Sequence, residues 1–259
     1  MTPDHAARAA PRAEANGTRA ADTAREAFPD WRFAPNIGHH PRVYEIENRA
    51  LARAGHVTHA MRLLAPWAGQ TLVDLGCGTG FWLTGYAAEA ARVIGIEPDP
   101  ALRAKAAART AGLPAVEVVA GSAEHLGLPA SSADVVHARF AYFFPPNGEA
   151  GLTEVLRVLR PGGALVVVDN DYRWGEFATM LDAASPEGVL RKADATDAWW
   201  RDRGAIRREV RSGWSFDRRA DLEAVLRIEF PAQVADAWLA RNPSATSISY
   251  GYVLFAVLA

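Results

Sequence analysis

The sequence predicts an α/β fold, in which a sheet of mostly parallel strands carries helices on both faces. First, apolar runs of strand length alternate with helical stretches from residue 71 to residue 169, and this alternation is typical of a parallel sheet covered on both sides. Second, the first apolar run leads into the segment Val73-Asp74-Leu75-Gly76-Cys77-Gly78-Thr79-Gly80. A glycine-rich turn between a strand and a helix is a common ligand-binding feature of such sheets.

The chain divides into three predicted regions. Residues 1–27 are rich in Ala, Arg and small polar residues and contain no large apolar side chain after the first residue, so we expect a disordered tail. Residues 28–67 bring aromatic side chains and a helical spacing of apolar residues, which predicts a helical cap. Residues 68–259 then form the sheet domain, with an irregular insertion near residues 172–204.

Within the cap, Gly55 is expected to divide the segment into two helices. On the first helix, Glu47 falls inside the apolar stripe and Tyr44 lies on its flank. Because a buried acid needs a partner, two interpretations of Glu47 are open. Glu47 either pairs with a neighbouring Arg, or the helix covers a ligand site in which Glu47 orients a substrate or another side chain.

Seven strands are expected along the sheet domain. The first five lie near residues 71–75, 93–97, 115–120, 133–138 and 164–169. The C-terminal part supplies a strand near 206–214, an amphipathic helix with Leu222, Val225, Leu226 and Glu229, and a last strand at 248–258.

The glycine turn indicates a nucleotide-like ligand. Glycines let the main chain approach a ligand without a side-chain clash, and the helix expected from about Phe81 offers free N–H groups. A nicotinamide fingerprint would read GxGxxG, whereas the spacing here is GxGxG, so hydride chemistry is disfavoured. The second strand ends at Glu97, whose carboxylate can accept two ribose hydroxyls.

Together with these motifs, three further segments make the chain resemble the class I S-adenosylmethionine (SAM) dependent methyltransferases. They are Gly121-Ser122-Ala123-Glu124-His125-Leu126, Asp134-Val135-Val136-His137-Ala138-Arg139-Phe140 and Leu159-Arg160-Pro161-Gly162-Gly163-Ala164-Leu165. The resemblance covers roughly residues 60–170. It implies a seven-stranded, Rossmann-like methyltransferase sheet with an antiparallel last strand, SAM as cofactor and S-adenosylhomocysteine (SAH) as product.

The resemblance also implies a set of cofactor-binding residues. The glycine turn and Asp74 would contact the aminoacyl and ribose parts of SAM, Glu97 the ribose, and Ser122 and Ala123 the adenine edge, although the family often has Asp where Ser122 stands. Tyr44 of the cap would lie near the methionine end. The full predicted set is Tyr44, Asp74, Gly76, Cys77, Gly78, Gly80, Glu97, Pro98, Ser122, Ala123, Glu124 and Ala138.

Three residues after the fourth strand are candidates for catalysis. His137 is a candidate general base because its ordinary pKa lies near neutrality. If Ala138 faces the cofactor, however, strand alternation turns His137 into a helix-covered layer. Arg139 and Tyr142 are the alternative candidates and would contact an anionic or phenolic substrate.

No metal ion is predicted. The segment Asp169-Asn170-Asp171 is similar to the acid-amide pair of metal-dependent catechol methyltransferases. Those enzymes also need a carboxylate after the fourth strand, where this chain has His137 and Arg139. Since hard divalent metals want several oxygen ligands, Asp169 is expected to bond a substrate or cap its loop instead.

Composition limits the partners. The 259 residues carry a formal net charge of −2 and one cysteine, Cys77, which excludes an intramolecular disulfide and gives no overall attraction to nucleic acid or anionic membranes. No apolar run approaches the roughly twenty residues needed to span a bilayer. We expect a cytoplasmic protein, a monomer or homodimer, with a small-molecule substrate.

The leading functional hypothesis is methyl transfer from SAM to O, N or C of a small organic metabolite or natural product. Two alternatives are open. A protein of the same fold can retain SAM and catalyse a rearrangement without transfer, or act as a non-catalytic binding module.

Overall fold

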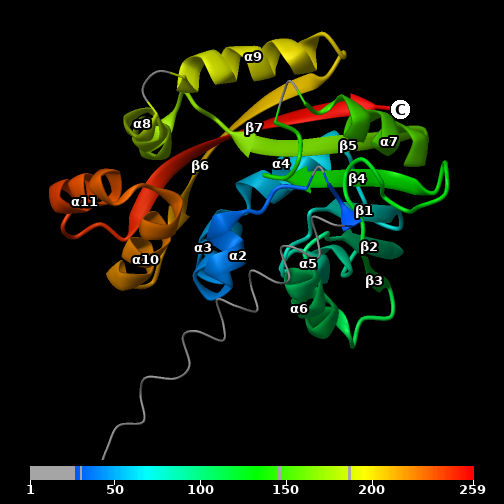
Figure 1. The fold of residues 1–259 in the computed structure, drawn as a ribbon, viewed down its shortest axis with the longest axis horizontal. Coiled ribbons are helices and arrows are strands. Elements are labelled where there is room, and N and C mark those ends of the chain that lie inside the picture. The colour runs from blue at the N-terminus through cyan, green and yellow to red at the C-terminus, as the bar shows by residue number, and fades with distance from the viewer. Residues whose placement is uncertain (1–26, 30, 145–146, 186–187) are drawn as a thin grey trace, which may run out of the picture.

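In the computed structural model, a seven-stranded sheet runs through the centre of the molecule (Figure 1). The structure describes residues 27–29, 31–144, 147–185 and 188–259. The strand order is β3-β2-β1-β4-β5-β7-β6, and β7 runs antiparallel to both of its neighbours. The strands are β1 (Thr71–Leu75), β2 (Arg92–Ile96), β3 (Val116–Val119), β4 (Ala133–Arg139), β5 (Leu159–Asn170), β6 (Ile206–Ser215) and β7 (Ser247–Leu258). The predicted fold, with its antiparallel last strand, is confirmed.

Helices cover both faces of this sheet. One apolar layer contains side chains of α3, α4, α5, α6, α8, α10 and α11, and the other contains side chains of α7 and α9. In Figure 1, α9 lies above the sheet and α7 lies beside β5 at the right. The helices are α2 (Pro35–His39), α3 (Pro41–Ala54), α4 (His56–Leu64), α5 (Leu83–Tyr86), α6 (Pro100–Thr110), α7 (Glu149–Val158), α8 (Gly175–Ala184), α9 (Val189–Arg201), α10 (Arg219–Glu229) and α11 (Ala232–Arg241).

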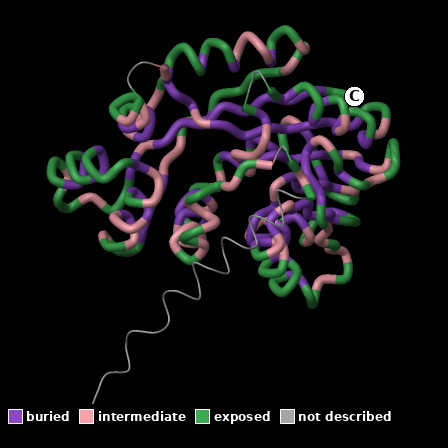
Figure 2. The backbone as a smooth tube through the Cα atoms, viewed as in Figure 1, coloured by how far each residue is buried: buried purple, intermediate pink, exposed green. Residues whose placement is uncertain are grey.

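The central strands are buried on both faces because each separates two helical layers. Nearly all of β1 and β4 is buried, and Figure 2 shows buried residues concentrated along the strands. Such strands read as continuous apolar runs, which is why they were recognisable in the sequence. The edge strand β6 instead exposes Arg207, Arg208 and Arg211, and charged side chains on an edge oppose pairing with another chain.

The helices before the sheet follow the predicted division at Gly55. This residue has a φ of 67° and stands between the C-terminus of α3 and the N-terminus of α4. Glycine adopts a left-handed conformation at little cost, so it ends one helix and lets the next begin at a new angle. As a result, α2 and α3 lie between α10 and the pair α5 and α6 (Figure 1).

The structure corrects the prediction that residues 172–204 are irregular, because they contain α8 and α9. In α9 the buried side chains are Val189, Ala193, Thr196 and Trp200, which have helical spacing but include two small residues, so the apolar periodicity was weak. Helix α11 was not predicted either. The predicted disordered tail falls almost wholly on residues 1–26, which lie outside the described residues.

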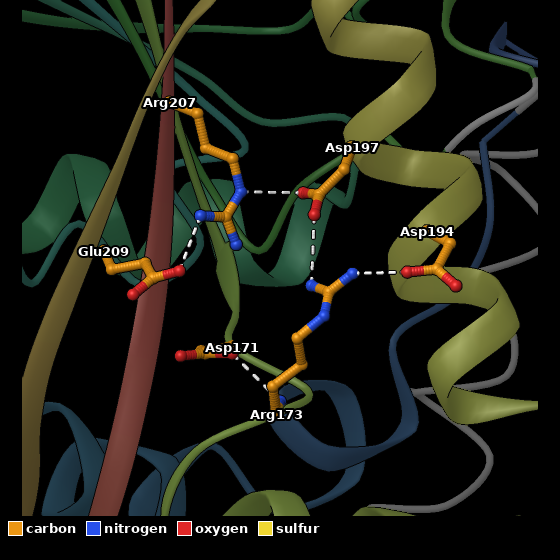
Figure 3. Close-up of polar contacts among 6 residues, drawn as sticks. All are labelled: Asp171, Arg173, Asp194, Asp197, Arg207 and Glu209. Carbon is orange, nitrogen blue, oxygen red and sulfur yellow. Dashed lines mark hydrogen bonds and ion pairs between the residues drawn. The ribbon is translucent and has the colours of Figure 1, made fainter.

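Asp197 of α9 joins two arginines from different elements (Figure 3). Its carboxylate lies 3.0 Å from Nη1 of Arg173, which follows β5, and 2.9 Å from Nε of Arg207 on β6. The two arginines also pair with Asp194 and Glu209, at 2.6 Å and 2.7 Å. This network ties α9 to the sheet edge.

We therefore expect Asp197→Ala to lower the free energy of unfolding by about 1 kcal/mol, the upper range for partly exposed ion pairs. Asp194→Ala is the matched control, because the side chain of Asp194 is 76% exposed and makes one of these contacts; its effect should be under about 0.5 kcal/mol. Urea unfolding of both variants measures the difference. Equal effects would contradict the bridging role of Asp197.

Candidate functional site

A cavity of about 810 Å³ opens at the carboxyl ends of the central strands. Its walls come from the turns after β1, β2, β3 and β4, together with α2 and α3. In the strand order, β1 lies between β2 and β4. The strands β2 and β3 are therefore added on one side of β1, and β4 and β5 on its other side. Such switch points are where open α/β sheets bind their ligands.

Ten of the predicted cofactor residues line this cavity. They are Tyr44, Asp74, Gly76, Cys77, Gly78, Glu97, Pro98, Ser122, Ala123 and Glu124.

The glycine turn is packed too closely for side chains. Gly76 has a φ of 73°, and a Cβ there would lie 2.7 Å from the Cβ of Ala141. Gly78 has a φ of 57°, and a Cβ there would lie 2.8 Å from Cδ1 of Ile37 on α2. At both positions a glycine is favoured because φ is positive and a neighbouring side chain lies close. At Gly78 this neighbour belongs to α2, which lies over the turn.

Gly80 departs from its predicted role. It does not belong to the cavity lining, and a Cβ there would lie 2.9 Å from Cα and Cβ of Ala106 on α6. Its φ of 75° completes the turn. The structure therefore corrects the prediction of a cofactor contact: Gly80 lets the turn pack against α6.

Glu97 is fixed by main-chain donors on both carboxylate oxygens. The N–H of Gly78 donates to Oε2 at 2.8 Å, and the N–H of Asp99 donates to Oε1 at 2.9 Å. Glu97 is 5% exposed, and burial raises its pKa to about 7 against the opposing effect of these N–H groups. Each oxygen keeps a lone pair for a ligand hydroxyl, so Glu97 is a rigid acceptor in the cavity wall.

In another part of the wall, the carboxyl group of Asp74 lies near the guanidinium of Arg139. Asp74 is 3% exposed; burial raises its pKa to about 7, and the nearby Arg139 charge opposes this rise. Nε of Arg139 donates to the hydroxyl of Tyr86 at 2.8 Å, and the guanidinium lies 4.0 Å from the ring centroid of Trp82. These contacts hold the guanidinium plane in one orientation.

The remaining donors of Arg139 have no partner. Arg139 is 9% exposed, and its Nη1 and Nη2 atoms are buried without a hydrogen bond among the described residues. A buried unpaired donor is costly, and these donors belong to a residue that lines the cavity. The site is therefore suited to an anionic group beside Arg139 and a cationic group beside Asp74.

His137 and Ala138 take opposite faces of β4, as strand alternation requires. His137 is fully buried, and its ring lies 5.2 Å from that of Trp67 and 5.1 Å from that of Tyr86. Burial lowers the His137 pKa well below its ordinary value, and the Arg139 charge adds to this effect. The structure corrects the prediction that His137 is a general base, because it lies outside the cavity lining.

Ala138 also lies outside the lining. It is fully buried in the apolar layer that includes Val73 and Leu165. Because Ala138 is outside the cavity lining, the structure does not support its predicted cofactor contact.

Tyr142 lines the cavity, but its hydroxyl is engaged by α7. The N–H of Gly151 donates to this hydroxyl at 3.0 Å, and a Cβ on Gly151 would lie 2.1 Å from Cε1 of Tyr142. Tyr142 and Phe140 have φ values of 60° and 50°, which non-glycine residues adopt at a cost and which cluster at functional sites. The loop after β4 is thus anchored in a strained conformation beside the cavity.

Glu47 also lines the cavity, and its partner was not foreseen. Among the described residues, neither an Arg nor a Lys pairs with it; its carboxyl group hydrogen-bonds with that of Glu229 at the end of α10. Asn36 donates from Nδ2 to Oε1 of Glu229 at 2.8 Å. The predicted pairing of Glu47 with an Arg is therefore wrong, and no local sequence signal connected α3 with α10.

Among the described residues, no cluster of three or more His, Cys, Asp or Glu side chains has the arrangement of a metal site. Nor does any described helix have the length and apolar character to span a bilayer.

Comparison with known families identifies the central part of the chain. Residues 73–167 match the family model described as a methyltransferase domain. They form a class I, Rossmann-like methyltransferase domain. This methyltransferase domain runs from β1 into β5 and contains Asp74, Glu97 and Arg139, whereas the helices before β1 and the elements after β5 lie outside the match.

Curated relatives share part of this methyltransferase domain. The demethylmenaquinone methyltransferase of Clavibacter sepedonicus is 34% identical over 108 residues, which are 42% of this chain and 44% of that protein. A ubiquinone/menaquinone biosynthesis C-methyltransferase of Rubrivivax gelatinosus is 36% identical over 109 residues, 42% of this chain and 43% of that protein. The matched region thus spans less than half the length of either relative.

Solved structures share the fold more widely. The YcgJ protein from Bacillus subtilis has a TM-score of 0.54 at 18% identity, covering 79% of this chain and 97% of that one. A SAM-dependent methyltransferase from Aquifex aeolicus has a TM-score of 0.52 at 15% identity, covering 88% and 100%. These likenesses extend the methyltransferase fold beyond the matched domain to most of the chain.

The raised pKa values of Asp74 and Glu97 predict that the ligand-free protein loses stability as pH rises. Burial raises both pKa values to about 7. The unfolded chain releases these protons near pH 4, whereas the folded protein holds them until about pH 7, so the free energy of unfolding should fall across this window. Each group contributes at most about 1.4 kcal/mol per pH unit.

Urea unfolding at pH 5 and pH 7 measures this fall. Asp74→Asn and Glu97→Gln should each reduce it, because an amide has no proton to release. Glu89→Gln, at a surface ion pair with Arg62, is the matched control and should leave the fall unchanged. The same pH dependence in all four proteins would rule out this assignment.

Proposed function

We propose that the protein binds SAM in this cavity and transfers its methyl group to a small organic molecule. The observation that carries the proposal is the set of buried charges around the glycine turn, where Asp74, Glu97 and Arg139 offer both signs of charge to one ligand. The two curated relatives are named as methyltransferases of demethylmenaquinone and of ubiquinone/menaquinone biosynthesis, which supports a small-molecule acceptor.

The residues present fit SAM at each of its polar groups. Glu97 would accept the ribose hydroxyls, and the segment Ser122–Ala123 would face the adenine. The aminoacyl part carries an ammonium and a carboxylate; Asp74 would accept hydrogen bonds from the ammonium, and Nη1 and Nη2 of Arg139 would donate to the carboxylate. This placement satisfies the unpaired donors of Arg139.

When bound, SAM supplies a methyl group already activated on a sulfonium, so the protein's task is to hold a nucleophile close and in line. Residues from α3, the segment before α2 and the loop after β4 enclose the cavity, among them Tyr44, Phe33 and Phe140. Apolar and aromatic walls exclude water and strengthen the local electrostatics. Since His137 lies outside the cavity, it takes no part in proton transfer.

Transfer itself is tested by incubating the protein and methyl-labelled SAM with a metabolite extract of its source, then separating small molecules, RNA and protein. We expect label in the small-molecule fraction and SAH as co-product. Label in RNA or protein would contradict a small-molecule acceptor. Binding of SAM with no transfer to any fraction would favour a SAM-retaining rearrangement or a binding module.

The ribose role of Glu97 makes a prediction for cofactor binding. Glu97→Gln should weaken SAM binding about tenfold or more, because a hydrogen bond to a charged group contributes about 1.5–3 kcal/mol. Isothermal titration calorimetry measures the dissociation constant, with Glu89→Gln as a matched surface control. An unchanged dissociation constant in Glu97→Gln would remove Glu97 from the cofactor site.

A further inference from the structure

A pair of acids lies at the side of the cavity formed by the helices before β1. Glu47 on α3 is 7% exposed, lines the cavity, and has one carboxyl oxygen, Oε2, that is buried without a hydrogen-bond partner among the described residues. Glu229, at the end of α10, is partly buried next to it and does not line the cavity. Glu47 is thus the member of the pair that a ligand meets.

The protein leaves this pair without a counter-charge. The described partner of Glu229, apart from Glu47, is the neutral amide of Asn36, at 2.8 Å. Burial raises the pKa of Glu47 well above its ordinary value, and the neighbouring Glu229 charge raises it further. In the described part of the chain, no Arg, Lys or His side chain is among the causes that shift the pKa of either carboxyl group. Burial also raises the pKa of Glu229. Two acids in contact share a proton, and a cation bound beside them favours the ionised form.

The surroundings of the pair are aromatic. Tyr44 is close enough for the charges of both acids to raise its pKa, although burial is the larger cause. Tyr252 is also affected by Glu47, and its ring lies 6.1 Å from that of Phe140, a cavity-lining residue. A buried negative charge beside aromatic rings is the chemistry that recognises an organic ammonium.

This ammonium is not that of the cofactor. Asp74 stands at the glycine turn and already provides an acceptor for the SAM ammonium, and Arg139 lies next to Asp74. Glu47 comes from a different element, α3, outside the matched methyltransferase domain. A part of the chain outside the matched domain therefore supplies the second acidic site.

We propose that Glu47, supported by Glu229, binds a protonated amine of the methyl acceptor, so that the substrate is a small aromatic or apolar molecule carrying a basic nitrogen. That the amine is the methyl acceptor rests on the proposed function. The binding preference for an amine follows from the cavity itself and holds with or without the cofactor.

The test compares an amine with a neutral molecule of nearly equal shape. Phenethylamine and 2-phenylethanol are titrated by calorimetry into the wild-type protein, in the absence of SAH and at saturating SAH. We expect the amine to bind at least tenfold more tightly than the alcohol. Binding of the two probes with equal affinity would overturn the proposal.

Three variants then locate the preference. Glu47→Gln is close in shape, removes the ionisable carboxyl group that faces the cavity, and should abolish the preference for the amine. Glu229 does not line the cavity, so Glu229→Gln should reduce the preference for the amine only through its contact with Glu47. This variant tests the pair even if Glu47→Gln folds poorly. Glu223→Gln is the matched control, because Glu223 lies on α10 and pairs with Arg219. A preference that persists in Glu47→Gln would overturn the proposal.

The same titrations separate this inference from the proposed function. The affinity for SAH should be unchanged in Glu47→Gln. A loss of SAH affinity equal to the loss of amine affinity would assign Glu47 to the cofactor and overturn the amine subsite. A wild-type protein that prefers the amine but binds neither SAM nor SAH would contradict the proposed function and leave the amine subsite supported.

Discussion

Burial of charge around one cavity is the constraint on which the arrangement of this protein depends. Asp74, Glu97, Arg139 and Glu47 are between 3% and 9% exposed, and buried charges are costly unless they are paired or hydrogen-bonded. Main-chain N–H groups compensate Glu97. Even so, burial raises the pKa values of Glu97, Asp74 and Glu47, and Arg139 and Glu47 keep buried atoms without a hydrogen bond among the described residues. The cavity is therefore suited to a ligand that carries charges of its own.

The fold explains how these charges come together. A parallel sheet gathers the ends of β1, β2 and β4 at one edge, which places residues distant in sequence around one cavity. Two features then close it. Because Gly78 has no side chain, Ile37 of α2 can approach the turn. Because α3 ends at Gly55, α3 can lie across the site. The matched domain contributes Asp74, Glu97 and Arg139, while α3 and α10 add Glu47 and Glu229 from outside the match.

The sequence was informative where a function depends on neighbours along the chain. Asp74 and Glu97 were predicted because each ends an apolar strand at the edge where ligands bind. His137 was ambiguous, since alternation places it opposite Ala138 and both faces of β4 are buried. Its packing against Trp67 and Tyr86 exists only in the folded protein. Glu229 was beyond prediction as a site residue, because its contact with α3 exists only in the folded protein.

The central claim is that the buried charges hold the two ends of one SAM-like ligand. A crystal structure with bound SAH tests it most directly. The account predicts the ribose hydroxyls at the carboxylate of Glu97 and the aminoacyl carboxylate at Nη1 and Nη2 of Arg139, with the ammonium beside Asp74. SAH bound outside this cavity, or bound with its carboxylate away from Arg139, would contradict the account.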